Sequence, residues 1–341
     1  MSAWRGKNGR YHTEGMPHVT KIIRKPEGVG CEIKAAACAQ TGCLVMLEIQ
    51  EGKDRMKLKR FQLRADQALH DAAYQQQRDA GQVFKYSTAV TLRLAQPWFG
   101  NRREVVVDSA FASVESLIEC HKKGMYMKGI VKTASVQYPK AVLREWGKSG
   151  GPGGNPPARG SHKVLKSTYT INGEEHTMMA VGWMDKTLKT VISNRGTTLP
   201  GTASMRHRDH LEVDPETGVL ATVHSVFEVA RPHVVESLFS SFNTIDVHDA
   251  ARQGYLAMER NWRTHDYQDR IIATVEGLIY CDCYRAALFD HQRAGHAPEA
   301  GAFMGLFEYL DKLCHRMIFN PMLIAPVRAA AQPPKVCGID H

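Results

Sequence analysis

The sequence predicts an α/β fold that is interrupted by a β-rich insertion and followed by a helical C-terminal part. Residues 105–131 have the pattern strand, helix, strand, which is the crossover that two parallel strands need. Residues 164–223 carry closely spaced strand patterns, with an Asn-Gly turn at 172–173. Residues 231–325 contain long amphipathic stretches with helical spacing.

The composition is that of an ordinary globular protein. The chain has 341 residues, enough for two domains or for one domain with an insertion. Hydrophobic residues make up 43% and charged residues 23%, which excludes wholesale disorder. Lys and Arg outnumber Asp and Glu by 44 to 35, for a net charge of +9. This charge suits a polyanionic partner, although many cytosolic proteins are also basic.

Membrane segments and structural disulfides are not expected. No apolar run reaches the roughly 18 residues of a membrane span, and residues 1–10 lack the apolar run of a secretory signal. The eight cysteines include no C-x-x-C pair, so we expect reduced intracellular thiols. Cys281, Cys283 and Cys314 are compatible with a metal site, but their apolar helical surroundings favour buried small side chains.

The N-terminal region is predicted to contain a loop, a hairpin and a helix. Residues 1–28 are polar and rich in Gly, which predicts an extended loop. Two apolar runs, 31–38 and 43–49, flank a Thr-Gly turn and predict a β-hairpin. Residues 54–78 are rich in good helix formers and predict one or two solvated helices.

The strand–helix–strand unit has clear limits. A β-branched run at 105–107 stops at Asp108, an apolar stretch at helical spacing follows at 111–118, and residues 127–131 predict the second strand. The Gly/Pro-rich segment 148–160 then predicts a linker in which little can pack.

The second half of the chain changes from strands to helices. We predict strands at 166–171, 176–183 and 189–193, and helices at 247–260, 266–289 and 302–317. The predicted parts are a first part of the core at 1–134, a separate β-rich insertion at 135–231, the rest of the core with C-terminal helices at 232–325, and a tail at 326–341.

Asp108 is the first candidate for chemistry. It ends a strand that is predicted to be buried, and ligands and metals gather at the carboxyl ends of strands in open α/β sheets. The alternative is that Asp108 caps the following helix by accepting hydrogen bonds from backbone N–H groups. From its position alone, the helix cap is favoured.

Asp246 and Asp249 are the second candidates. They lie three residues apart and would share one face of a helix. Two carboxylates there repel each other unless a divalent cation or an arginine lies between them. The alternative is a solvated first turn, where the helix dipole favours aspartate. From these residues alone, this alternative is favoured.

A polar cluster lies in the predicted insertion. His207, Asp209 and His210 are compatible with metal binding, but a polar loop beside Pro200 and Gly201 explains them equally well. We therefore assign them no role.

A set of short motifs occurs in order along residues 1–290. The motifs are M-S-A-W-R-G-K at 1–7, K-P at 25–26 with glycines at 28 and 30, T-G at 41–42, E-G-K at 51–53, V-D-S-A-F-A-S at 107–113, G-M-Y-M-K-G-I-V-K at 124–132, S-F-N-T-I-D-V-H-D at 241–249, a tryptophan at 262 and I-Y-C-D-C-Y at 279–284. In order and spacing this set resembles the piggyBac-type transposases, a DDE family with an RNase H-like core. The resemblance raises both aspartate hypotheses above their alternatives.

The resemblance implies DNA cut-and-paste transposition. Asp108 and Asp246 would be two of three converging acids, with Asp249 as an auxiliary, and together they would hold two Mg²⁺ ions for strand cleavage and transfer. The partner would be double-stranded DNA at transposon ends, bound in the nucleus and with a homodimer as a further assembly. The excess of Lys and Arg would supply phosphate contacts.

The chain departs from the family pattern in several places. The family's first catalytic Asp follows a core strand that precedes the segment matched by 1–7, so we expect both to be missing. Asn243 and Thr244 replace two glycines, and Asp282 replaces an asparagine. Neither the N-terminal DNA-binding region nor the C-terminal zinc module is matched, although Cys337 and His341 could begin the latter.

These departures predict a truncated core that does not cleave DNA by itself. We also expect a gap between the strands at 31–38 and 105–107, and an insoluble or molten product when this chain is expressed alone. Two alternatives stay open: a domesticated, non-catalytic DNA-binding protein, and an unrelated α/β enzyme whose aspartates are structural.

Overall fold

The architecture comes from a computed structural model, which describes residues 2–3, 18–23, 28–56, 84–132, 137–213, 218–261, 264, 266–294 and 303–320. Most of the predicted helix at 54–78, the K-P motif at 25–26, Trp262 and the tail at 326–341 lie outside the described residues. In the part of the chain that is described, no helix has both the length and the apolar character needed to cross a membrane.

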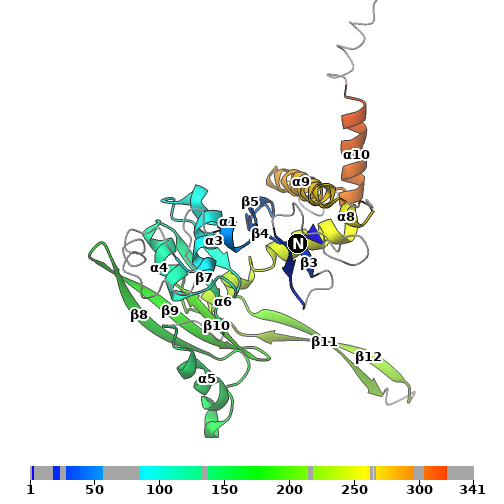
Figure 1. Cartoon of the computed structure of the whole chain (residues 1–341). Coiled ribbons are helices and arrows are strands. Elements are labelled where there is room, and N and C mark those ends of the chain that lie inside the picture. Colours follow the sequence, from blue (N-terminus) through cyan, green and yellow to red (C-terminus); the bar gives the residue numbers. More distant parts are fainter. Residues whose placement is uncertain are drawn as a thin grey trace, which may run out of the picture.

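The largest sheet is mixed and has five strands (Figure 1). In spatial order these are β6 (Glu104–Val107), β7 (Tyr126–Ile130), β10 (Leu188–Ser193), β9 (Glu174–Met184) and β8 (His162–Ile171). β6 and β7 are parallel and are joined by α4 (Val114–Lys122), which confirms the predicted strand–helix–strand unit. The other neighbouring strands are antiparallel.

Helices cover both faces of this sheet. The covering helices are α3 (Tyr86–Ala95), α4, α5 (Lys140–Ser149) and α6 (His233–Phe239). Met127 and Ile192 belong to one hydrophobic core with Leu117 of α4. Val191, the neighbour of Ile192, belongs to a second core with Leu238 of α6. Successive side chains of a strand therefore enter opposite cores, as the two-residue period requires.

The strands after the predicted linker continue this sheet, so the separate lobe expected for them is not formed. β10 pairs with β7, with Val191 opposite Ile130, and the β9–β8 hairpin follows outward. Residues 179–183 of β9 are all buried, because both faces of the strand are covered. The predicted hairpin turn is present: Asn172 and Gly173 have φ angles of 51° and 84°, the positive values that a two-residue turn needs.

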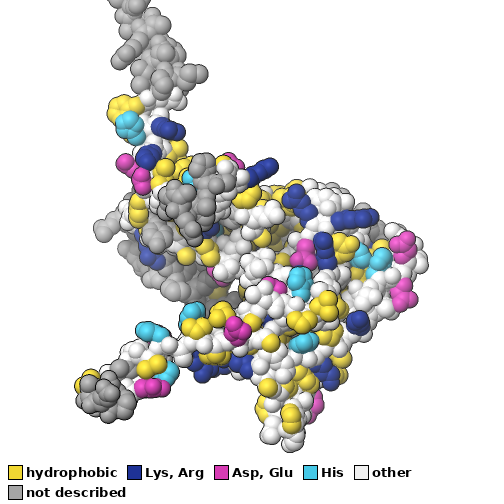
Figure 2. Space-filling view, turned by 180° about the vertical axis from the view of Figure 1, so that it is seen from behind, with side chains coloured by type: hydrophobic (Ala, Val, Ile, Leu, Met, Phe, Trp, Pro, Cys, Tyr) yellow, Lys and Arg dark blue, Asp and Glu magenta, His cyan; other side chains and the backbone are white. Residues whose placement is uncertain are grey.

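The rest of the predicted insertion is a two-stranded ribbon that projects away from the sheet (Figures 1 and 2). Its strands are β11 (Ser204–Val213) and β12 (Leu220–Val229). His207, Asp209 and His210 lie in β11, so the polar loop expected there is wrong. Two of these side chains have hydrogen-bond partners within the ribbon. Asp209 Oδ1 lies 2.7 Å from Nδ1 of His224 on the other strand, and His210 Nε2 lies 2.7 Å from Oε1 of Glu212 on the same strand.

The segment predicted as a linker contains regular structure. α5 extends to Ser149, and a short 3₁₀ turn follows at Pro152–Gly154. Arg159 near its end donates to Asp185 Oδ1 at 2.6 Å, and Pro157 and Gly160 are buried. The segment is therefore anchored at its end by Pro157, Arg159 and Gly160, whereas residues 152–156 are exposed.

The first hairpin lies in a separate sheet from β6. β4 (Ile33–Ala37) and β5 (Leu44–Ile49) form the predicted hairpin, and a small three-stranded sheet contains β1 (Ser2–Ala3), β3 (Val29–Cys31) and β2 (Thr20–Lys21). Within the described ranges, β6 pairs only with β7, and the gap between 31–38 and 105–107 stays a prediction. The hairpin nevertheless packs near the end of β6, because Lys34 Nζ lies 5.4 Å from the centre of the Phe111 ring.

Two short helical elements lie in the first half of the chain, α1 (Lys53–Met56) and the 3₁₀ turn Gln96–Trp98. The described part of 231–325 is mostly helical, as predicted. Besides α6 it contains α7 (Thr244–Ala250), a π-helical segment (Ala251–Leu256), α8 (Met258–Asn261), α9 (Tyr267–Arg293) and α10 (Leu306–Ile318). Cys281 is buried in α9 as predicted, whereas Cys314 of α10 is exposed.

Candidate functional site

Asp108 lies directly after β6, where the chain turns toward α4. Its side chain is exposed, and its Oδ1 accepts hydrogen bonds from the backbone N–H and the hydroxyl of Ser109. Its backbone carbonyl accepts from the N–H groups of Phe111 and Ala112 at 2.9 and 3.0 Å, which closes the turn. The carboxylate therefore stands at the carboxyl end of a strand in the parallel part of the sheet.

The helix-cap alternative for Asp108 is wrong. α4 begins at Val114, and its N-cap is Ser113, whose hydroxyl oxygen accepts from Ser116 N–H at 3.0 Å. Ser113 fits this role because a short hydroxyl side chain reaches the orphan N–H groups of the first turn. The Asp108 carboxylate therefore does not cap α4.

Gly129 allows the Asp108 turn to pack on the neighbouring strand. It lies opposite Val107 in the parallel pair β6–β7. A Cβ atom at Gly129 would lie 2.6 Å from Val107 Cγ2 and 2.9 Å from Ala112 Cβ. Any side chain at this position would therefore displace the segment that carries Asp108.

The other two candidate acids lie on α7 in different surroundings. Asp246 is in the first turn of the helix and is exposed. Asp249 is half-buried, and its Oδ1 accepts from Arg252 Nη2 at 3.2 Å. The arginine is thus paired with one of the two carboxylates, that of Asp249.

Arg252 belongs to a buried ion pair. Its side chain is 1% exposed and donates through Nη1 to both carboxylate oxygens of Glu259, which is 2% exposed. Gly277 of α9 leaves room for it, because a Cβ atom there would lie 3.2 Å from Arg252 Cγ. Burial raises the pKa of the neighbouring Cys281 thiol to about 11, so the thiol stays neutral beside these charges.

His248 connects α7 to the rest of the molecule. It lies between the two acids in sequence, its side chain is 1% exposed, and its Nε2 lies 3.0 Å from Asp282 Oδ1 of α9. Asp282 Oδ1 also accepts from Leu44 N–H of β5 at 2.8 Å. One carboxylate thus joins α7, α9 and the first hairpin.

The three candidate acids do not form the metal cluster that we expected. Among the described residues, no group of three or more His, Cys, Asp or Glu side chains could hold a metal ion. Carboxylates suit Mg²⁺ chemically, but one oxygen of Asp249 already accepts a hydrogen bond from Arg252. Among the described residues, Asp108, Asp246 and Asp249 therefore do not make up a three-ligand Mg²⁺ site, and their roles as catalytic acids stay predictions.

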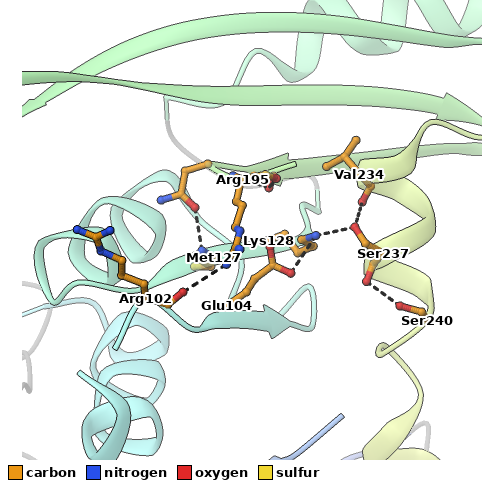
Figure 3. Close-up of polar contacts among 10 residues, drawn as sticks. Arg102, Glu104, Met127, Lys128, Arg195, Val234, Ser237 and Ser240 are labelled. Carbon is orange, nitrogen blue, oxygen red and sulfur yellow. Dashed lines mark hydrogen bonds and ion pairs between the residues drawn. The ribbon is translucent and has the colours of Figure 1, made fainter. Parts of the chain in front are cut away.

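A buried lysine beside the strand that leads to Asp108 was not predicted from the sequence. Lys128 of β7 is 2% exposed; its Nζ lies 2.9 Å from Glu104 Oε1 and donates to Ser237 Oγ of α6 at 2.6 Å (Figure 3). These contacts fix β6, β7 and α6 to one another. The sequence does contain an indication of it, because Lys128 is the one charged residue in the apolar run 125–131.

Comparisons with known proteins agree with this architecture. The family model for DDE transposases described as Transposase IS4 matches residues 12–275. The cryo-EM structure of the piggyBac transposase synaptic complex with hairpin DNA is similar, with a TM-score of 0.52 and 13% sequence identity. This similarity covers 95% of the present chain and 56% of that chain, and at such low identity it shows the fold alone. A search of curated proteins gave no match. Because the family model covers more than half of the 341 residues, the chain belongs to the Transposase IS4 family of DDE transposases.

Proposed function

We propose that the chain is a piggyBac-like transposase core that binds double-stranded DNA. The family match over residues 12–275 carries this proposal. The net charge of +9 supports it, because Lys and Arg in excess supply sequence-independent contacts to DNA phosphates. The similar solved structure is that of a transposase in a synaptic complex with hairpin DNA.

The β6–α4–β7 unit is, in this proposal, part of an RNase H-like core. Asp108, Asp246 and Asp249 are its candidate acids, and the exposure of Asp108 and Asp246 is compatible with contact to DNA. Because the three acids do not converge into a metal-holding group among the described residues, we expect this chain to hold DNA without cutting it. Action in the nucleus and a homodimer stay predictions.

A non-catalytic DNA-binding protein derived from a transposase is the second candidate. The contact between Arg252 and Asp249 favours it, because a guanidinium occupies the carboxylate that a divalent cation would need. Both candidates require DNA binding, and they differ in strand cleavage.

Fluorescence anisotropy with a labelled duplex tests the shared part of the proposal. We expect the logarithm of the binding constant to fall linearly with the logarithm of the salt concentration. Each phosphate contact should contribute about 0.9 to the negative slope. Absence of binding at low salt would overturn the proposed function. Incubation with supercoiled plasmid and Mg²⁺ or Mn²⁺ separates the candidates, since nicked product would support the catalytic one.

A further inference from the structure

A polar cavity of about 220 Å³ lies between the first hairpin, α7 and α9. The turn between β4 and β5 contributes Gln40, the start of α7 contributes Asn243, and α9 contributes Arg285 and Gln292. The volume is far above the ~15 Å³ that one buried water requires. The cavity therefore has room for a small polar group together with ordered water.

Among the described residues that line this cavity, Arg285 is the one ionisable side chain, and none is Asp or Glu. Within the described part of the chain, no carboxylate forms an ion pair with Arg285. Asp282, one turn away on α9, directs its Oδ1 to His248 and Leu44 instead. The cavity thus carries an uncompensated positive charge.

Gly42 shapes the wall that Arg285 packs against. Its φ angle is +74°, and a Cβ atom there would lie 3.2 Å from both Cδ and Nη1 of Arg285. A glycine is required for the backbone conformation and also leaves the guanidinium its place. The glycine at position 42 and the left-handed turn that it forms therefore both allow the Arg285 guanidinium to lie against this wall.

We propose that this cavity binds one sugar–phosphate unit of a nucleic acid strand, with the phosphate on Arg285. Guanidinium groups bind phosphate oxygens with two parallel N–H donors. The side-chain amides of Gln40, Asn243 and Gln292 supply neutral donors, which are common in phosphate contacts to DNA.

The remaining wall favours a strand over a free anion. Val247, Leu288 and Phe289 form an apolar side of the cavity that suits the carbon face of a deoxyribose. Asn243 and Val247 also flank Asp246 in the chain, so a strand bound here would run beside an acid of the proposed site. The inference rests on the proposed function and specifies where the strand is held.

The test compares duplex binding by the whole chain with that of Arg285→Gln and Arg293→Gln. Arg293 is exposed near the end of the same helix and does not line the cavity, so it controls for loss of one charge. We expect Arg285→Gln to weaken binding about tenfold and to lower the salt slope by about one contact, and the control to change binding less than about twofold.

A second variant guards against a folding defect. Gln292→Glu places a carboxylate at an exposed position of the lining, and we expect it to weaken binding while the melting temperature stays unchanged. Inorganic phosphate tests whether the cavity binds a free anion and not a nucleic acid strand. If phosphate stabilises the protein only when Arg285 is present, and all variants bind DNA equally well, the proposal is overturned. Equal DNA binding by wild type and Arg285→Gln overturns this inference alone, whereas no DNA binding by wild type overturns the proposed function as well.

Discussion

His248 of α7 and Asp282 of α9, 34 residues apart in sequence, share a hydrogen bond of 3.0 Å between Nε2 and Oδ1. The same Oδ1 accepts from Leu44 N–H at 2.8 Å. His248 lies between Asp246 and Asp249, so this carboxylate holds in place the helix that carries both acids. The resemblance identified Asp282 only as a departure from an asparagine; the structure gives it a role in fixing α7.

Replacement of Asp282 by alanine should therefore destabilise the protein. The backbone N–H of Leu44 and the buried His248 ring would lose their partner, and an unsatisfied buried group costs ~1–3 kcal/mol. Asp282→Asn should cost less, because its amide oxygen still accepts from Leu44. Urea denaturation measures the change, with Asp290→Ala, an exposed aspartate of the same helix, as control. Equal stability of the two alanine variants would contradict the role assigned to Asp282.

Arg252→Met should be among the most destabilising single substitutions. It leaves Glu259 charged and buried without its partner, a situation that costs ~3–5 kcal/mol. The double variant Arg252→Met/Glu259→Leu should recover part of this loss, since it removes both charges. Lys312→Ala breaks an exposed ion pair with Glu308 and should change the free energy of unfolding by less than ~1 kcal/mol. A double variant that is less stable than Arg252→Met would refute this account.

These relationships show which parts of the fold were accessible from sequence. The parallel pair around α4 was predicted because its strand limits, helix stop and apolar spacing are all local. The strands β8, β9 and β10 were also predicted, but their membership of the main sheet was not. That membership depends on the pairing of Val191 with Ile130, which no local alternation specifies.

The site was predictable to a smaller extent. The position of Asp108 at a strand end followed from the run of valines before it. Its freedom from the cap of α4 did not, because Ser113 and Asp108 are both good caps and only the helix start decides between them. The partners of His248 and Arg252 could not be predicted, because they depend on how the helices pack. Polar residues in amphipathic segments are usually solvated, so nothing in the sequence indicates that these two are buried.

Stability should depend on pH through His121. Burial, and then the neighbouring His176 whose ring centre lies 4.5 Å away, lower the pKa of His121 below its usual 6.5. The folded protein therefore resists protonation of this ring while the unfolded chain accepts the proton near pH 6.5. The resulting stability is present above pH 6.5 and decreases as the pH falls toward the lowered pKa of the folded state.

His121→Phe should reduce this pH dependence. Between about pH 7.5 and about pH 5.5, the free energy of unfolding should fall less in the variant than in the wild type. His207→Phe, a substitution at an exposed position of the ribbon, should keep the wild-type slope. Identical slopes for wild type and His121→Phe in denaturant titrations would show that another group is responsible.

Divalent metal should bind this chain weakly, and its effect should not depend on the candidate acids. A two-metal site needs carboxylates that converge, and no such group exists among the described residues. We expect Mn²⁺ to leave the melting temperature of wild type, Asp108→Asn and Asp246→Asn equally unaffected, and plasmid DNA to stay uncut. A site filled to 100 times its dissociation constant would instead add about 2.7 kcal/mol of stability. Stabilisation by Mn²⁺ that is lost in both variants would show that Asp108 and Asp246 meet in solution, and would favour the catalytic candidate over the non-catalytic one.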